Sequence, residues 1–295
     1  MMEKKHELFE GVCTALATPF RNGAIDYDAL YEMIEIQIEG GVSAICVCGT
    51  TGEAATLTDL ERGRLVETAA EYIDGRTDYI VGVGTPSTAK SCAYARFAHQ
   101  AGAKGLLVVT PYYNKGTYGG ITTHFQTIAD ATPLPVILYN VPGRTGVNLT
   151  IPHIGEISRH PNIAGLKEAG DSVEKLTNFM EAFGGRLRLY AGNDSHIIPT
   201  LALGGSGVIS VVSNILPYEM MELWRRWKAG NIQEATRMQL AFLPLIRLLF
   251  EDVNPAPLKC ALNMMGVCEE EVRLPLTTVS PALKERIRDW LGLTN

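Results

Sequence analysis

Residues 136–170, VILYNVPGRTGVNLTIPHIGEISRHPNIAGLKEAG, contain the repeating unit that decides the fold. The short apolar runs Val136–Tyr139 and Ile163–Leu166 have the length and composition of buried strands, and Ile151–Ser158 between them has a helical pattern. A strand, a helix and a second strand in this order predict two parallel strands. The second run ends in Lys167, which is an unusual place for a cation, because lysines are almost never fully buried without a partner.

The same alternation continues from about Gly11 to Ser210, where strand-like runs are each followed by a helix-like segment. One of these helices, Thr58–Ile73, begins with Thr-Asp-Leu-Glu, which is a capping box. Eight such units fit a closed (β/α)8 TIM barrel better than an open doubly wound sheet, and no GxGxxG or GxxxxGK[ST] loop opens a helix. The other six strands are predicted at Val12–Ala17, Ala44–Val47, Ile80–Val83, Gly105–Val109, Leu187–Tyr190 and Gly207–Val211.

The pattern changes after Gly230. The segments Asn231–Glu251, Pro257–Met265 and Pro281–Leu291 are all helix-like, with no strand-like run between them. No Gly/Ser-rich linker separates them from the barrel. We therefore expect two domains: residues 1–230 form the barrel with its catalytic site, and residues 231–295 form a C-terminal helical extension packed on it.

Composition excludes several classes of function. The net charge of −6 over 295 residues does not indicate a basic surface that would bind nucleic acid. The six cysteines lack the spacing of a zinc site and are typical of buried, reduced thiols in a cytoplasmic protein. The N-terminal MMEKKHELFEG lacks the apolar core of a signal peptide, and no apolar run reaches the roughly 18 residues of a membrane span. We therefore expect a cytoplasmic protein without nucleic-acid or membrane partners.

In a barrel of this type the active site lies at the C-terminal ends of the strands. Those ends bring together one lysine, Lys167, with tyrosine and threonine hydroxyls and the arginine Arg144. They contain neither a His/Asp/Glu metal cluster nor a Ser–His pair. A lysine with hydroxyl donors and no metal suggests covalent amine catalysis, in which the amine forms a Schiff base with a ketone and no cofactor is needed.

The amine must lose its proton before it attacks, and a desolvated barrel mouth favours its neutral form. Tyr139, on the neighbouring strand end, can both donate and accept a proton, and Thr50 or Tyr113 can pass it on. Thr51 and the amides around it suit a small carboxylate, and Arg144 offers a bidentate fork for a second one.

Each of these residues also has an ordinary structural interpretation. A lysine commonly closes a strand at a barrel rim, a tyrosine such as Tyr113 commonly packs, and Arg144 in a Pro-Gly-Arg turn is usually solvated. Thr50–Gly52 fits a tight turn equally well. The catalytic interpretation is favoured because all of these residues fall at the same end of the predicted barrel.

Six motifs lie within or after the predicted strands: GTTGE (49–53), YYN (112–114), YNVPGRTG (139–146), GLKEA (165–169), AGND (191–194) and GVIS (207–210). They occur in the order found in the pyruvate-dependent class I aldolase family, which the chain resembles from about residue 9 to its C-terminus. The resemblance implies a (β/α)8 barrel with a C-terminal helical extension and a Schiff base between pyruvate and Lys167. It makes Tyr139 the proton donor and acceptor, with Thr50 and Tyr113 completing the relay and Tyr113 contributed across a dimer interface.

The resemblance also assigns the substrates. Thr51, Gly192 and the backbone of Ile209 would hold pyruvate, and no metal would be bound. The NVPGRTG motif favours the branch that condenses pyruvate with L-aspartate 4-semialdehyde on the route to lysine, with Arg144 binding the carboxylate of the semialdehyde. A sister aldolase, such as N-acetylneuraminate lyase or a 2-keto-3-deoxy acid aldolase, is the alternative. Members are usually homotetramers built from two tight dimers.

The chain departs from the family at a regulatory site. Lysine-inhibited relatives typically have histidines at the positions of Asp59 and Arg62, asparagine at Pro86 and glutamate at Lys90. A glutamate would attract the amino group of a lysine ligand, whereas Lys90 repels it. We therefore expect weak or absent inhibition by lysine.

Overall fold

The computed structural model describes residues 7–293. Its main sheet is a closed barrel with the strand order β1-β10-β9-β8-β7-β6-β5-β4, which confirms the predicted TIM barrel. Residues 1–6, within the segment that lacks a signal-peptide core, lie outside the described residues. The barrel strands are β1 (Gly11–Ala15), β4 (Ala44–Val47), β5 (Asp78–Gly82), β6 (Gly105–Val109), β7 (Val136–Asn140), β8 (Ile163–Glu168), β9 (Arg188–Ala191) and β10 (Gly207–Ser210).

The chain divides into two compact units. The first consists of residues 7–11 and 78–209, and the second of residues 12–77 and 210–293. This division does not coincide with residue 230, so the predicted barrel domain 1–230 and extension 231–295 stay a prediction.

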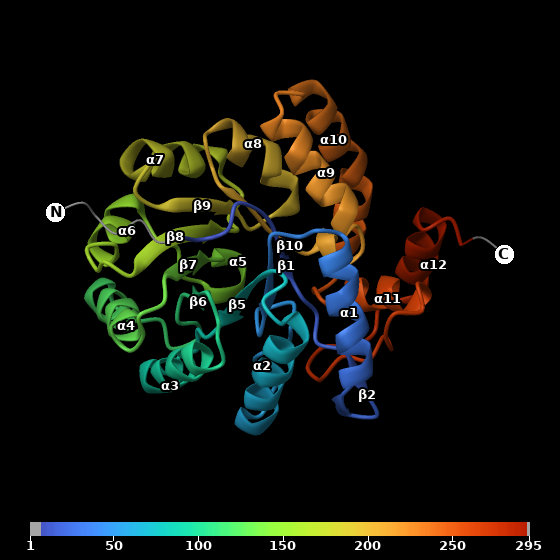
Figure 1. Ribbon diagram of the computed structural model, residues 1–295, viewed down its shortest axis with the longest axis horizontal. Helices are drawn as coiled ribbons and strands as arrows, with labels where there is room; N and C mark the ends of the chain where they lie inside the picture. Colours follow the sequence, from blue (N-terminus) through green and yellow to red (C-terminus); the bar gives the residue numbers. More distant parts are fainter. Residues whose placement is uncertain (1–6, 294–295) are drawn as a thin grey trace. The chain divides into compact units, whose positions relative to one another are not determined.

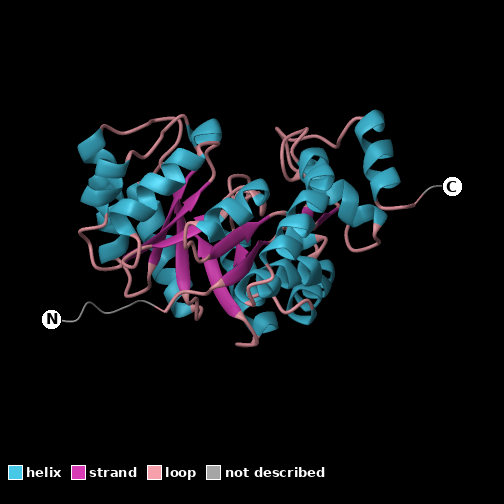
Figure 2. Cartoon of the chain, turned by 90° about the horizontal axis from the view of Figure 1, so that it is seen from above, coloured by secondary structure: helices cyan, strands magenta, loops and turns pink. Residues whose placement is uncertain are grey.

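In the first unit, β5 to β10 pair in parallel in sequence order. Every residue of β7 and β8 is buried, as expected for a parallel sheet whose two faces are both covered. The helices lie on the outer side of these strands (Figure 1), and Figure 2 shows strands and helices from above. They are α3 (Thr88–Gln100), α4 (Tyr118–Asp130), α6 (Ile151–Ile157), α7 (Val173–Phe183) and α8 (Ile197–Ala202), with the 3-10 turn η1 (Asp194–His196) before α8.

The second unit contains β1 paired in parallel with β4, and it is otherwise mostly helical. Helix α9 packs against α10, and α11 packs against α12. Within residues 211–293 the structure contains no strand, which confirms the helical C-terminal region. The helices are α1 (Tyr27–Glu39), α2 (Asp59–Ile73), α9 (Pro217–Lys228), α10 (Ile232–Leu249), α11 (Ala256–Met264) and α12 (Pro281–Trp290), with the 3-10 turn η2 (Val212–Asn214) before α9.

Serine or threonine side chains cap the N-termini of several helices. The predicted capping box at α2 is present: Thr58 Oγ1 accepts from the backbone N–H of Glu61, and the Glu61 carboxylate accepts from the N–H of Thr58. In the first unit, side-chain oxygens of Ser87 and Thr117 cap α3 and α4 in the same way. The cap of α2 explains why the start of this helix was readable from local sequence.

Two short elements differ from the expectation. Phe20–Arg21 (β2) and Ala24–Ile25 (β3) form a hairpin in which Asn22 and Gly23 both have positive φ, 54° and 82°. Asn-Gly is a strong signal for such a two-residue turn, so the hairpin was readable. Pro142–Thr145, expected as a turn, forms the single-turn helix α5, because proline is pre-organised for the first helical position.

Candidate active site

Lys167 and Tyr139 are neighbours at the ends of β8 and β7. They are opposite each other in the parallel register, and Lys167 Nζ lies 4.4 Å from the centroid of the Tyr139 ring. Their side chains are nearly inaccessible, with 5% and 6% of their surfaces exposed. The lysine at the end of the apolar run is therefore an interior amine against a phenol ring rather than a solvated strand terminus.

Glu168, the next residue, has its own buried partners. Its carboxylate pairs with Lys175 Nζ at 2.9 Å and accepts from Asn140 Nδ2 at 2.9 and 3.0 Å, one bond to each oxygen. The backbone N–H of Gly170 donates to the same carboxylate at 2.7 Å. Because successive strand residues point to opposite faces, these contacts place Glu168 away from the face that Lys167 occupies.

The same polar cluster connects three segments of the first unit. Asn140 is opposite Glu168 in the register, directly after the Tyr139–Lys167 pair. The Asn148 side-chain oxygen accepts from Lys175 Nζ at 2.6 Å and from Asn140 Nδ2 at 3.0 Å. Sequence reasoning missed this cluster, although polar residues directly after two buried runs were a usable signal.

Two further predicted residues follow β8 in the chain: Gly192 lies directly after β9, and Ile209 lies in β10. Gly192 donates its N–H to the carbonyl of Glu168 at 2.7 Å, and a Cβ at this position would lie 2.6 Å from the Cβ of Ala169. Only glycine fits this close approach between the chain segments. Ile209 is completely buried in β10.

Tyr113 and Arg144 are exposed on segments after the strand ends. Tyr113 has 94% of its side chain exposed and a left-handed backbone with φ 64°, so the structure does not pack it against Tyr139. Arg144 is on α5, directly after β7.

Thr50 and Thr51 belong to the second unit, in the segment after β4. Thr51 is buried, and its Oγ1 accepts from Asn254 Nδ2 at 3.0 Å, whereas Thr50 is half-buried. Burial raises the pKa of the nearby Cys48 thiol, so this cysteine stays protonated and is a poor nucleophile.

The first unit therefore offers an amine suited to attack on a carbonyl, with a phenol on the neighbouring strand to exchange protons. Among residues 7–293 there is no group of three or more His, Cys, Asp or Glu side chains arranged to hold a metal ion. In the described part of the chain, no helix is both long and apolar enough to cross a membrane.

Comparison with known proteins gives consistent matches over nearly the whole length. The profile of the dihydrodipicolinate synthetase family matches residues 8–292. The 4-hydroxy-tetrahydrodipicolinate synthase of Alkaliphilus oremlandii is 43% identical over 288 residues, 98% of this chain and 99% of the relative. The dihydrodipicolinate synthase structure from Thermotoga maritima has a TM-score of 0.94 and 40% identity, covering 97% of this chain and 99% of its own. A structure described as the first monomeric dihydrodipicolinate synthase variant has a TM-score of 0.93 and 40% identity, covering 96% of each chain.

Proposed function

Because the chain belongs to the dihydrodipicolinate synthetase family, we propose that it is a lyase that condenses pyruvate with L-aspartate 4-semialdehyde through a Schiff base on Lys167. The product is 4-hydroxy-tetrahydrodipicolinate, in the diaminopimelate route to lysine. The observation that carries the proposal is the buried Lys167 amine beside Tyr139. All six cysteines are buried, which supports a reducing, cytoplasmic setting.

The reaction needs no cofactor beyond the lysine. The neutral Nζ attacks C2 of pyruvate, and loss of water from the carbinolamine leaves a protonated imine. Loss of a proton from C3 gives an enamine, which attacks the aldehyde carbon of the semialdehyde. The amino group that the semialdehyde brings then attacks C2 of the regenerated imine, which closes the ring and breaks the bond from C2 to the Lys167 nitrogen.

The proton transfers are assigned to hydroxyl groups. Tyr139 accepts and returns protons during formation and loss of the carbinolamine, and Thr50 and Tyr113 complete the relay. Thr51, Gly192 and the backbone of Ile209 hold the pyruvate moiety. Arg144 binds the carboxylate of the semialdehyde.

We propose a homotetramer of two tight dimers, in which Tyr113 serves the site of a second copy. An almost fully exposed tyrosine on a left-handed backbone is an unfavourable surface for an isolated chain and supports burial by a partner. The relative described as monomeric makes the oligomeric state an experimental question for this chain.

Arg144→Ala distinguishes this reaction from that of a sister aldolase. We expect kcat/KM for aspartate semialdehyde to fall by about 10- to 100-fold, because a charge-assisted contact to the carboxylate is lost. The measurement is a coupled assay with pyruvate and the semialdehyde. Arg159→Ala, which removes an exposed arginine of the same unit, is the control and should leave the rate unchanged. Turnover of sialic acid or a 2-keto-3-deoxy acid, without turnover of the semialdehyde, would favour the alternative.

Lysine should inhibit weakly. We expect most of the activity to persist at about 1 mM lysine, because Lys90 stands where an acidic residue would attract the ligand's amino group. Lys90→Glu should increase the inhibition, and the neutral Lys90→Gln should have a smaller effect. Strong inhibition of the parent chain at sub-millimolar lysine would contradict this prediction.

A further inference from the structure

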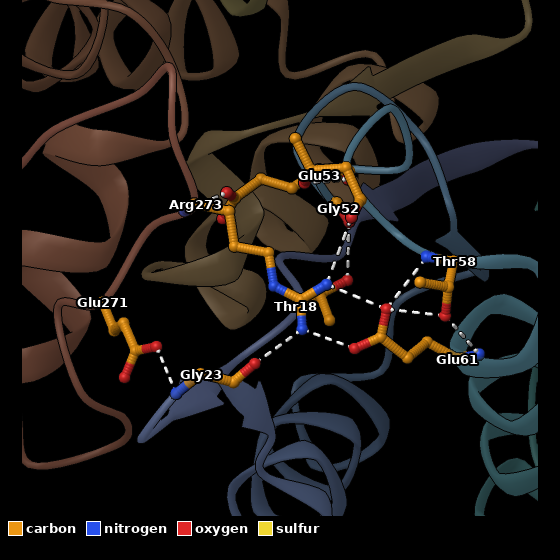
Figure 3. A network of polar contacts seen from close by, with 9 residues as sticks. Thr18, Gly23, Gly52, Glu53, Thr58, Glu61, Glu271 and Arg273 are labelled. Carbon is orange, nitrogen blue, oxygen red and sulfur yellow. Dashed lines mark hydrogen bonds and ion pairs between the residues drawn. The ribbon is translucent and has the colours of Figure 1, made fainter.

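The C-terminal segment of the second unit, which we define as residues 254–273, contacts the threonine loop, which we define as Gly49–Glu53. Hydrogen bonds join this loop to Asn254, Lys259 and Arg273, which lie more than 200 positions later in the chain. Figure 3 shows Gly52 and Glu53 beside Arg273, whose guanidinium group reaches on to Glu61 and to the carbonyl of Gly23. The C-terminal segment carries none of the proposed catalytic residues. It nevertheless holds in place the threonine loop, which carries Thr50.

The contact between Asn254 and Thr51 sets the direction of one hydroxyl group. Asn254 Nδ2 donates to Thr51 Oγ1 at 3.0 Å, and both residues are buried. A hydroxyl that accepts from an amide keeps its own single proton for another partner. A carboxylate can only accept. Asn254 thus orients Thr51 as a donor, which is the role that binding of an anion requires.

The Glu53 side chain fixes the end of the loop. Its two oxygens accept from Lys259 Nζ at 2.5 Å and from the backbone N–H of Arg273 at 3.0 Å. Lys259 has no exposed surface, and its Nζ lies 4.0 Å from the centroid of the Phe20 ring. Desolvation lowers the pKa of Lys259, and the Glu53 carboxylate opposes that shift. Lys259 and Glu53 stay in contact, because separating them would leave each buried charge without a compensating partner.

The loop backbone needs such support. Glu53 has a left-handed backbone with φ 51°, a conformation that residues other than glycine rarely adopt. Its N–H donates to the Thr50 carbonyl at 3.1 Å, and the Gly52 carbonyl accepts from Thr18 Oγ1 at 2.7 Å. The buried contacts to the C-terminal segment offset the cost of this local shape.

We propose that Asn254 is a positioning residue for the substrate carboxylate: it presents the Thr51 hydroxyl as a donor, on a loop held in place by the Glu53–Lys259 pair. The proposal rests on the proposed function, in which Thr51 binds pyruvate. It gives the C-terminal segment a role in substrate affinity as well as in folding.

Asn254→Asp tests the proposal because it keeps the size of the side chain and reverses its hydrogen bonding. A carboxylate at this position accepts the Thr51 proton and so turns it away from the substrate. The pyruvate concentration that half-saturates borohydride trapping on Lys167 should rise by about 10- to 100-fold. The KM for pyruvate should rise in parallel, with a smaller fall in kcat. Asn254→Leu, which buries no charge, should raise the half-saturating pyruvate concentration and the KM for pyruvate by about 3- to 10-fold. Equal half-saturation in the parent chain and both variants would overturn the proposal.

Two comparisons separate positioning from a general loss of structure. Asn263→Asp is the matched control, because Asn263 Nδ2 donates to the Cys268 carbonyl at 3.0 Å in the same segment. It should lower the melting temperature without shifting the pyruvate dependence. In a Thr51→Val background, Asn254→Asp should add no further shift. An equal shift in the control, or a full further shift in the Thr51→Val background, would contradict the proposal.

The parent chain separates this inference from the proposed function. No pyruvate adduct on Lys167 of the parent chain would overturn the proposed function. An adduct that forms at the same pyruvate concentration in the parent chain and in the Asn254 variants would overturn only the role of Asn254.

Discussion

Lys167→Ala should abolish the covalent adduct that borohydride traps on the parent chain in the presence of pyruvate. The imine links the Lys167 nitrogen to C2 of pyruvate, and hydride converts it to a stable secondary amine; alanine has no nitrogen to form this bond. We expect kcat to fall by about 10⁴-fold or more, because the remaining groups cannot replace the covalent step. Peptide mapping by mass spectrometry locates the adduct, and the coupled assay gives the rate.

Lys104→Ala is the control for this experiment, because it removes an exposed lysine from the same unit. It should retain both the adduct and the activity. Melting temperatures of the three proteins show whether each variant is folded. An adduct that persists in Lys167→Ala, or that maps to another lysine of the parent chain, would remove the basis of the proposed mechanism.

Tyr139→Phe should lower kcat by about 10²- to 10⁴-fold while leaving the fold intact. Phenylalanine retains the ring that lies 4.4 Å from Lys167 Nζ but lacks the hydroxyl that exchanges protons with the carbinolamine. Because the nucleophile remains, the adduct should still form, but slowly. Stopped-time borohydride trapping measures the rate of adduct formation, and steady-state assays measure kcat.

Tyr190→Phe is a close control, because Tyr190 is the register partner of Lys167 on the other neighbouring strand. Its hydroxyl donates to the carbonyl of Phe9 at 2.8 Å, which is a structural contact. We expect the free energy of unfolding to fall by about 1 kcal/mol, with little change in kcat. Equal losses of kcat in the two variants would show that the Tyr139 hydroxyl has no special role in proton transfer.

Much of the candidate site was predictable because strand ends in a parallel barrel meet at one end. The run that ends at Lys167 and the run that ends at Tyr139 were both read as strands, and the register brings these two residues together. The position of Tyr113 was not predictable in the same way, because the segment that carries it leaves the barrel and exposes the ring. The assignments of Gly192 and Ile209 came from the family resemblance, and those of Thr50 and Thr51 also from their position after a strand end; all four remain proposals.

By itself the sequence determined the order of strands and helices, the capping box of Thr58 and Glu61, and the helical C-terminal region. These features depend on periodicity and on contacts between residues a few positions apart, so local sequence encodes them. Only the tertiary structure decided which partners the buried polar side chains near the strand ends contact. Asn140 pairs with Glu168 across 28 positions, and Asn254 with Thr51 across 203. Such partners are chosen by the path of the folded chain and by the need to satisfy buried polar groups. A local pattern can mark a polar residue after a buried run, but it does not specify the partner of that residue.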